Sequence, residues 1–371
     1  MRDMSDLLKS TTSGFLGKLD LSKEQKNIIM DATRKIKDCL SDAIAKEYDI
    51  HPRYMTQGSA KYKTQNQPCW PSQEVDYDLG CYLPFSDLEE TGKPYRAATV
   101  FFETVDNALE NLAKKEQWKG ICKEKNTCSR VLINKNIHMD IPLYSVPDKE
   151  FNTIKDFSET RKSLCSAEVY DSNIEEETWE DFDYDRVLLA HRKEGWQESD
   201  PRNVNKYFQT VFKMKGEQLR RICRYVKAWR DFKWKEGGPT SIYLMCLVED
   251  LFKAENSFGD DIGLLEILEM MPERLRNPVV NKSEDEELKM KNPEDLPLLI
   301  DYARAFSHDL HKAIHESSIS DDSACLLIQK HLGNRFPVVN HINSKSISGH
   351  IRSTPVNTGS SDMPLARVRV G

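Results

Sequence analysis

Residues 74–83 constrain the fold most strongly, because charged and apolar side chains alternate along them with a period of two. This alternation is typical of a β-strand with one buried face. Asp76 and Asp78 share one face, and the other is apolar. Two neighbouring carboxylates repel each other unless a cation neutralises them, and Mg²⁺ suits such an oxygen-rich pair together with substrate phosphates. A solvated acidic strand edge is the alternative.

Gly58 and Ser59 form a small, flexible pair upstream of this strand. Backbone N–H groups and a serine hydroxyl in such a place are suited to hold the polyphosphate of a nucleotide. The pair therefore favours a nucleotide site over a bare acidic edge.

A third acid, Asp140, lies in the apolar run 137–143, which a turn at 134–136 joins to a second apolar run at 129–133. This pattern predicts a β-hairpin, and an acid inside an apolar strand needs a partner. If the hairpin lies beside the first strand, the three aspartates meet. They would then hold two metal ions, one activating an attacking hydroxyl and one steadying the leaving pyrophosphate.

Four motifs in this order resemble one known family. They are T-Q-G-S-x-x-Y-x-T-x-N-x-P, Q-E-x-D-x-D-x-G-x-Y-x-P, H-x-D-I-P-x-Y-x-x-P, and R-x-x-K-A-W-R-D followed by G-G-P-x-S-I. Within the polymerase-β-type nucleotidyltransferases, they resemble the DncV-like branch of the cGAS/DncV-like enzymes, over roughly residues 20–337. Members of that branch make cyclic oligonucleotide second messengers in bacterial anti-phage (CBASS) defence.

The resemblance implies roles for particular residues. It implies that Asp76, Asp78 and Asp140 hold two Mg²⁺ ions, for which Mn²⁺ could substitute. It further implies ATP and GTP as substrates, with other NTPs possible, a purine cyclic dinucleotide such as cyclic GMP-AMP as product, and a downstream effector that senses it. The residues expected to bind substrate are Gln57, Gly58, Ser59, Arg130, Lys227 and Ser241; the spacing from Arg130 to Asp140 differs slightly from the family pattern.

The expected fold is α+β. The order of elements predicts a polymerase-β-like nucleotidyltransferase lobe with a mostly antiparallel sheet, joined by a long N-terminal helix to a helical C-terminal lobe. We assign residues 1–200 to the catalytic lobe, 201–337 to the helical lobe and 338–371 to a disordered tail. Residues 148–200 are expected to have little regular structure. Helices are predicted at 22–48, with a Ser22–Gln25 capping box, and at 94–118, 216–235, 264–271, 296–315 and 322–332.

Charge and composition limit the class of protein. The net charge of −7 and pI of about 5.8 argue against a dedicated duplex-binding protein. The nine cysteines form no C-x-x-C pair and are expected to be reduced thiols. No apolar run approaches the ~18 residues of a membrane helix, and no signal peptide is visible, so we expect a cytoplasmic protein. The acidic run 168–185 is expected to lie away from the site, whereas the basic run 202–235 suits triphosphate.

Two further features allow more than one interpretation. The C-terminal Gly371 ends a flexible tail, and such tails resemble substrates of E1/E2-like conjugating partners; an arbitrary chain end is the alternative. His308, His311 and His315 fall on one helical face, where they form either a transition-metal site or a solvated surface.

Two other functions are compatible with the same motifs. A template-free polymerase or a transferase acting on a small molecule or tRNA is one, although a long RNA acceptor calls for a broad basic surface that the acidic balance disfavours. A catalytically inactive scaffold is the other, although all three carboxylates are present.

Overall fold

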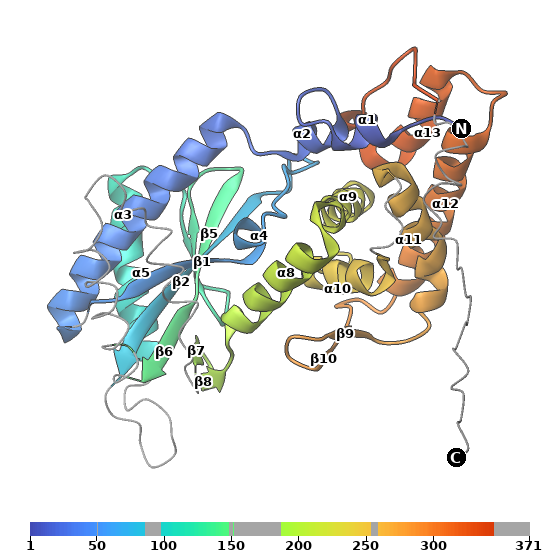
Figure 1. Ribbon diagram of the computed structural model, residues 1–371. Helices are drawn as coiled ribbons and strands as arrows, with labels where there is room; N and C mark the ends of the chain where they lie inside the picture. Colours follow the sequence, from blue (N-terminus) through green and yellow to red (C-terminus); the bar gives the residue numbers. More distant parts are fainter. Residues whose placement is uncertain (50, 86–97, 148–150, 152–186, 254–258, 345–371) are drawn as a thin grey trace, which may run out of the picture.

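The computed structural model describes residues 1–49, 51–85, 98–147, 151, 187–253 and 259–344, and it has two lobes (Figure 1). One lobe is built on a β-sheet and the other is helical. The acidic run 168–185, the start of the helix predicted from residue 94, and Gly371 lie outside the described residues.

The sheet is mixed, with its longest strand, β2, paired on both edges. β2 runs parallel to β5 and β6 and antiparallel to β1, and the remaining pairings are antiparallel. Among the described strands the sheet is therefore mostly antiparallel, as predicted, and it is parallel where β2 pairs with β5 and β6. Its strands are β1 (Arg53–Gln57), β2 (Val75–Phe85), β3 (Gly120–Cys122), β4 (Ser129–Leu132), β5 (Ile137–Ile141), β6 (Leu143–Pro147), β7 (Leu188–His191) and β8 (Gly195–Glu198).

Pro142 separates β5 from β6, which pair with successive parts of β2. Proline has no N–H to give to a ladder, so the strand is interrupted there. Its carbonyl still accepts a hydrogen bond from the Cys81 N–H at 2.9 Å, which keeps the two parts in line with β2.

Helices α3 (Lys23–Tyr48) and α5 (Ala98–Lys115) pack on the apolar face of the sheet (Figure 1). The predicted capping box is confirmed: Ser22 accepts from the Gln25 N–H and Gln25 from the Ser22 N–H. Leu79 and its odd-numbered neighbours in β2 face these helices, so the even-numbered acids face away from them. A short helix, α4 (Gly58–Lys61), follows β1 on the acidic side.

The other helices of the second lobe pack around α9 (Glu217–Lys233), whose apolar side, including Leu219, Ile222 and Trp229, is buried. The predicted C-terminal helices are confirmed. The helices are α1 (Ser5–Lys9), α2 (Phe15–Leu19), α8 (Pro201–Lys215), α9 (Glu217–Lys233), α10 (Ser241–Leu251), α11 (Asp260–Arg274), α12 (Asp295–His315) and α13 (Asp321–Leu332), with a 3₁₀ turn at Gly333–Arg335 and a hairpin of β9 (Val279–Asn281) and β10 (Glu286–Leu288).

The first 19 residues belong to the helical lobe, which corrects the predicted boundary. Met4, Leu8 and Phe15 are buried in its core, although they precede the sheet lobe in sequence. Asp261 in α11 accepts hydrogen bonds from the Met4 N–H at 2.9 Å and the Ser5 hydroxyl at 2.9 Å. The apolar side chains of this short segment thus find their partners far along the chain.

Residues 187–200 are also more regular than predicted. They form the β7–β8 hairpin, and Asp200 then caps α8 through the Arg202 N–H, with Pro201 in the first turn. An Asp-Pro pair is found both in turns and at the start of helices. Here Asp200 and Pro201 begin α8. The acidic residues 284–287 contribute to the β9–β10 hairpin.

The packed chain extends beyond the predicted boundary at residue 337. Ile342 is buried, and its N–H donates to Asp321 Oδ2 at 2.7 Å. Arg2 forms a β-bridge with Ser344. The predicted tail therefore starts at least seven residues too early, because these residues find partners at the N-terminus.

The described residues also bear on two expectations from composition. Eight cysteines lie among them, and all eight are free thiols. None of the described helices is both long enough and apolar enough to cross a bilayer.

Candidate active site

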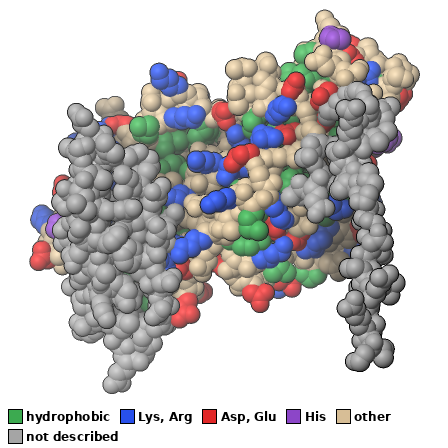
Figure 2. All heavy atoms as spheres, in the orientation of Figure 1, with side chains coloured by type: hydrophobic (Ala, Val, Ile, Leu, Met, Phe, Trp, Pro, Cys, Tyr) green, Lys and Arg blue, Asp and Glu red, His purple; other side chains and the backbone are tan. Residues whose placement is uncertain are grey.

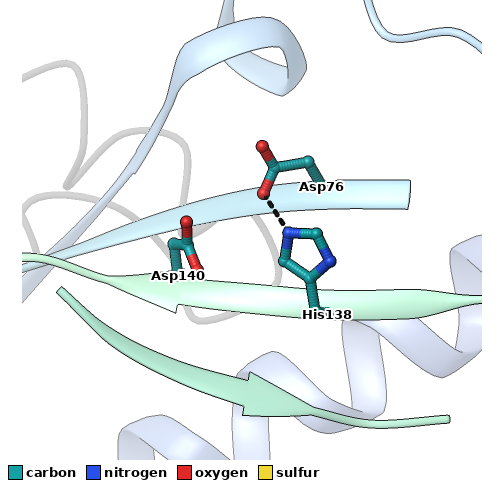
Figure 3. Close-up of side chains that lie close together, drawn as sticks. All are labelled: Asp76, His138 and Asp140. Carbon is teal, nitrogen blue, oxygen red and sulfur yellow. Dashed lines mark ion pairs between the residues drawn. The ribbon is translucent and has the colours of Figure 1, made fainter. Parts of the chain in front are cut away.

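The three predicted aspartates share one face of the sheet. In the parallel pairing of β2 with β5, Asp76 lies opposite His138 and Asp78 opposite Asp140. Residues paired across parallel strands point to the same side, so the predicted hairpin brings Asp140 beside the Asp76–Asp78 pair. Figure 3 shows Asp76, His138 and Asp140 directed toward one another.

Gly58 brings the start of α4 against Asp78. Its φ of +60° favours glycine, and a Cβ atom there would lie 2.1 Å from Asp78 Oδ2. Any side chain would therefore collide with this carboxylate. The first turn of α4, with Ser59, stands next to the aspartates for this reason.

A pocket of about 480 Å³ lies between the two lobes. Four of the predicted residues line it: Ser59 and Asp76 from the sheet lobe, and Lys227 and Ser241 from the helical lobe. The pocket is also lined by Gln65, Asn66, Pro68, Gln73, Glu74, Arg230, Asp231, Trp234, Lys235, Glu236 and Gly237. The sheet-lobe wall carries the carboxylates of Glu74 and Asp76, and the helical-lobe wall carries Lys227, Arg230 and Lys235 together with the acids Asp231 and Glu236. Carboxylates facing cations are the groups that a metal-bound polyphosphate needs.

The cationic wall is formed by α9 and the start of α10. Lys227 is buried, and its Nζ donates to the Thr64 carbonyl at 2.8 Å. Burial lowers the pKa of Lys227 to about 8. Ser241 is the first residue of α10, after the N-cap Thr240, and its hydroxyl accepts from Arg230 at 3.2 Å. Lys and Arg side chains also gather over the middle of the molecule, where Figure 1 shows α8 (Figure 2).

Two predicted substrate residues are engaged elsewhere. Arg130 makes a double ion pair with Asp140, with Nε–Oδ1 at 2.6 Å and Nη2–Oδ2 at 2.7 Å, and does not line the pocket. The buried side chain of Gln57 donates to the Tyr82 hydroxyl at 2.8 Å and accepts from Tyr144 at 3.3 Å. Arg130 orients a carboxylate, therefore, and Gln57 supports the strand that precedes Gly58.

The carboxylates influence each other's ionisation. Burial, and then the charges of Asp76 and Asp140, raise the pKa of Asp78 to about 7. Removal from water also opposes ionisation of Asp76, but contact with His138 outweighs it and lowers the pKa of Asp76. The group of acids thus holds a proton near neutrality that a bound cation would displace.

Three residues of the site were not predicted from the sequence: His138, Glu74 and Arg230. His138 Nδ1 lies 2.7 Å from Glu74 Oε2, and Nε2 lies 2.7 Å from Asp76 Oδ1. The signal was present, because His138 precedes Asp140 by two residues and so shares its face. Arg230 likewise follows Lys227 by three residues and so shares its side of α9.

Asp76, His138 and Asp140 also fit a metal ion. Each offers one ligand atom, and these atoms lie within 4.8 Å of one another. Over the described ranges no other such group of three is found. His308, His311 and His315 instead line a separate hollow of about 620 Å³ on α12, with Glu269 of α11. Fold and site together define a nucleotidyltransferase.

Comparison with known families agrees with this class. Residues 52–144 match the sequence model described as cyclic GMP-AMP synthase DncV-like, nucleotidyltransferase domain. Residues 216–345 match the cyclic GMP-AMP synthase C-terminal domain. The chain belongs to the DncV-like nucleotidyltransferases.

Several curated relatives are named cyclic GMP-AMP synthase. One from Escherichia coli (strain TW11681) is 32% identical over 274 residues, which are 71% of this chain and 62% of that protein. One from Vibrio cholerae is 34% identical over 224 residues, which are 58% of this chain and 50% of that protein. The matched region therefore spans half to somewhat under two thirds of these relatives.

Solved structures share the fold over a longer range. The Vibrio cholerae DncV cyclic AMP-GMP synthase superposes with a TM-score of 0.76 at 22% identity, covering 93% of this chain and all of that one. The same enzyme in complex with the linear intermediate 5′ pppA(3′,5′)pG gives a TM-score of 0.76 at 22% identity, covering 93% and 99%. At this identity the likeness concerns the fold.

Proposed function

We propose that this protein joins ATP and GTP into a cyclic dinucleotide, cyclic GMP-AMP. The observation that carries the proposal is the pocket between the lobes, which places Asp76 and Ser59 opposite Lys227 and Ser241. Relatives over 30% identical bear the name of this activity, which supports the choice of product. The product would act as a second messenger in anti-phage defence, read by a separate effector.

The residues divide the work of nucleotidyl transfer. When bound, two Mg²⁺ ions would neutralise the triphosphate and make the acceptor hydroxyl a better nucleophile. Asp76 and Asp78 would hold the ion on the donor triphosphate, and Asp140 would join them at the other. Ser59, Lys227 and Ser241 would fix the triphosphate and spread its charge.

The reaction then proceeds in two similar displacements. The acceptor ribose hydroxyl attacks the donor α-phosphate, its proton passes to solvent, and the bond to pyrophosphate breaks. The linear intermediate reorients within the pocket, and its free ribose hydroxyl attacks the remaining α-phosphate. A second pyrophosphate leaves and the ring is closed.

Product analysis tests the proposal. The full chain is incubated with Mg²⁺ and all four NTPs, treated with phosphatase, and analysed by mass spectrometry. A phosphatase-resistant cyclic GMP-AMP is expected. Only linear, phosphatase-sensitive products would instead favour the template-free polymerase, and no product with Mg²⁺ or Mn²⁺ would favour the inactive scaffold.

Removal of the carboxylates tests the assignment of the site, with an exposed acid elsewhere as the matched control. The double variant Asp76→Ala, Asp78→Ala should lose turnover while keeping the circular dichroism spectrum of the wild type, because both side chains point away from the apolar core that the sheet forms with α3 and α5. Asp301→Ala, an exposed acid on α12, should keep full activity. An active, folded double variant contradicts the assignment of the site.

We further propose that Gly371 is a conjugation site for an E1/E2-like partner. The support is the composition of residues 338–371, which are rich in Ser, Asn, Pro and Gly, and the glycine at position 371. Co-expression with such a partner should give a C-terminal adduct detectable by intact mass spectrometry, which deletion of Gly371 abolishes. An unmodified C-terminus under these conditions contradicts it.

A further inference from the structure

His138 is a buried imidazole that lies between two carboxylates. The residue is 6% exposed. Nδ1 pairs with Glu74 Oε2 at 2.7 Å, and Nε2 pairs with Asp76 Oδ1 at 2.7 Å. A cation bound at this place takes the position of the proton between Nε2 and Asp76, because metal binding releases the protons of its ligands.

We infer that His138 Nε2 is a direct ligand of the metal ion held by Asp76 and Asp140. The three ligand atoms lie within 4.8 Å of one another, so one cation can contact all three. The site would then contain nitrogen as well as oxygen. This inference rests on the metal role proposed above for the carboxylates, but not on the identity of the product.

Glu74 supplies the support that a ligating histidine needs. Metal-bound histidines usually donate their other ring N–H to a carboxylate, which fixes the tautomer and directs the free nitrogen at the metal. Glu74 Oε2 at Nδ1 provides this contact, and Nε2 is left to face the aspartates. Glu74 therefore acts as a positioning residue.

Asp140 keeps room for the ion despite its ion pair. An ionised carboxylate offers about four lone-pair positions, and Arg130 takes one on each oxygen. The Cys128 thiol also contacts Asp140, so about one position is left for a metal ion. Arg130 thereby holds the carboxylate at a fixed angle without blocking it.

The nitrogen ligand changes which cation the site prefers. Mg²⁺ selects oxygen ligands, whereas the first-row metals bind imidazole increasingly well from Mn²⁺ onward. Mn²⁺ accepts carboxylate, phosphate and imidazole together. The site should therefore favour Mn²⁺ over Mg²⁺ more strongly than three carboxylates alone would.

Pulsed electron paramagnetic resonance of bound Mn²⁺ tests the inference without any turnover. The full chain is loaded with substoichiometric Mn²⁺ in the absence of nucleotide. Modulation from a directly bound ¹⁴N nucleus is expected in the wild type. It should vanish in His138→Ala and persist in His308→Ala, a matched control at an exposed histidine on α12.

Affinity provides a second measurement. Titration of Mn²⁺ should show His138→Ala binding at least about tenfold more weakly, and Glu74→Gln more weakly by a smaller factor. Mg²⁺ affinity should change less than that of Mn²⁺ in both variants. The wild-type spectrum decides the question even if a variant fails to fold.

The possible failures are distinct. Tight Mn²⁺ binding without a nitrogen signal would overturn the inference alone, because the aspartates would then bind the metal without His138. Absence of Mn²⁺ binding in the wild type would overturn both the inference and the metal role of the carboxylates.

Discussion

Single residues in this site tolerate little change, and Gly58 shows why. Gly58→Ala would place a methyl group 2.1 Å from Asp78 Oδ2 and strain a backbone with φ of +60°. We expect a loss of kcat/KM of at least about 100-fold, since small displacements of reacting groups cost this much. Gly195 has φ of +77° but open space around it.

Gly195→Ala is therefore the matched control for backbone strain alone. It should lower thermal stability by about 1 kcal/mol and leave activity unchanged. Steady-state kinetics and melting curves of both variants are the measurement. Equal activity in the two variants would mean that the contact with Asp78 has no role in the reaction.

The ionisation of Asp78 gives a prediction for metal-free stability. Its pKa is raised in the folded state to about 7 from 3.8, so the folded protein binds more protons than the unfolded one between these values. Stability from this group is complete below pH 4 and is lost as pH rises toward 7. Asp78→Asn should remove the loss and stabilise the metal-free protein by up to about 4 kcal/mol at pH 8.

Chemical denaturation at several pH values measures this effect. The difference between Asp78→Asn and the wild type should grow from pH 4 to pH 7 and then level off. A difference independent of pH would contradict the raised pKa of Asp78. Saturating Mg²⁺ should shrink the difference, because the cation neutralises the same charges.

Residue patterns predicted several residues of the site, but not all of their contacts. The period of two placed Asp76 and Asp78 on one face, and the family motifs indicated Lys227 and Ser241. The pattern could not show that Arg130 and Gln57 are engaged by Asp140 and by tyrosines, because those contacts depend on the packing of distant strands.

At the scale of elements, the segment 64–73 ties the sheet lobe to α9. Gln73 Oε1 accepts from the Cys69 and Trp70 N–H groups at 3.0 and 3.2 Å, and its Nε2 donates to the Asp231 and Trp234 carbonyls at 2.8 and 3.1 Å. One side chain thus organises its own loop and joins it to the end of α9. Both parts line the pocket.

Gln73→Glu separates these two functions. A carboxylate keeps the contacts within the loop but turns two donors into acceptors facing carbonyl oxygens. We expect a loss of about 2–3 kcal/mol in stability, together with a higher KM for nucleotide and little change in kcat. Denaturation and initial rates measure the two effects.

Gln25→Glu is the control for this substitution, since glutamate serves equally in a capping box. It should change neither stability nor KM. A normal KM in Gln73→Glu would show that the contact between the loop and α9 does not shape the nucleotide site.

Elements with strong periodicity were predicted well, and short ones were not. Sustained patterns or caps are present in β2, the β4–β5 hairpin, α3 and α9. The five-residue helices α1 and α2 are too short to show a period. The parallel register of β2 with β5 is a tertiary contact that no local pattern contains.

At the scale of the whole molecule, the helical lobe takes its core from both ends of the described chain. Phe15 is fully buried, with ring centroids 6.0 Å from Tyr225 and 6.2 Å from Phe336. Phe15→Ala should cost about 3–5 kcal/mol, because it opens a cavity. The loss should be confined to the helical lobe.

Hydrogen exchange followed by mass spectrometry localises the effect. Phe15→Ala should raise exchange in peptides of α9 and α11 and spare β2 and β5. Phe102→Ala, a fully buried counterpart in α5, should do the reverse. Identical exchange patterns in both variants would mean that the lobes unfold as one unit.

The N-terminal helices have a mechanical consequence. Because residues 4–19 pack with the helical lobe, the sheet lobe is inserted into it, and the backbone crosses between the cores near residue 20 and again near residue 200. Two such crossings define a hinge axis between the lobes. Rotation about this axis would change the distance between the pocket wall that contains Asp76 and the wall that contains Lys227. The Lys227–Thr64 and Arg224–Asn66 hydrogen bonds oppose this rotation.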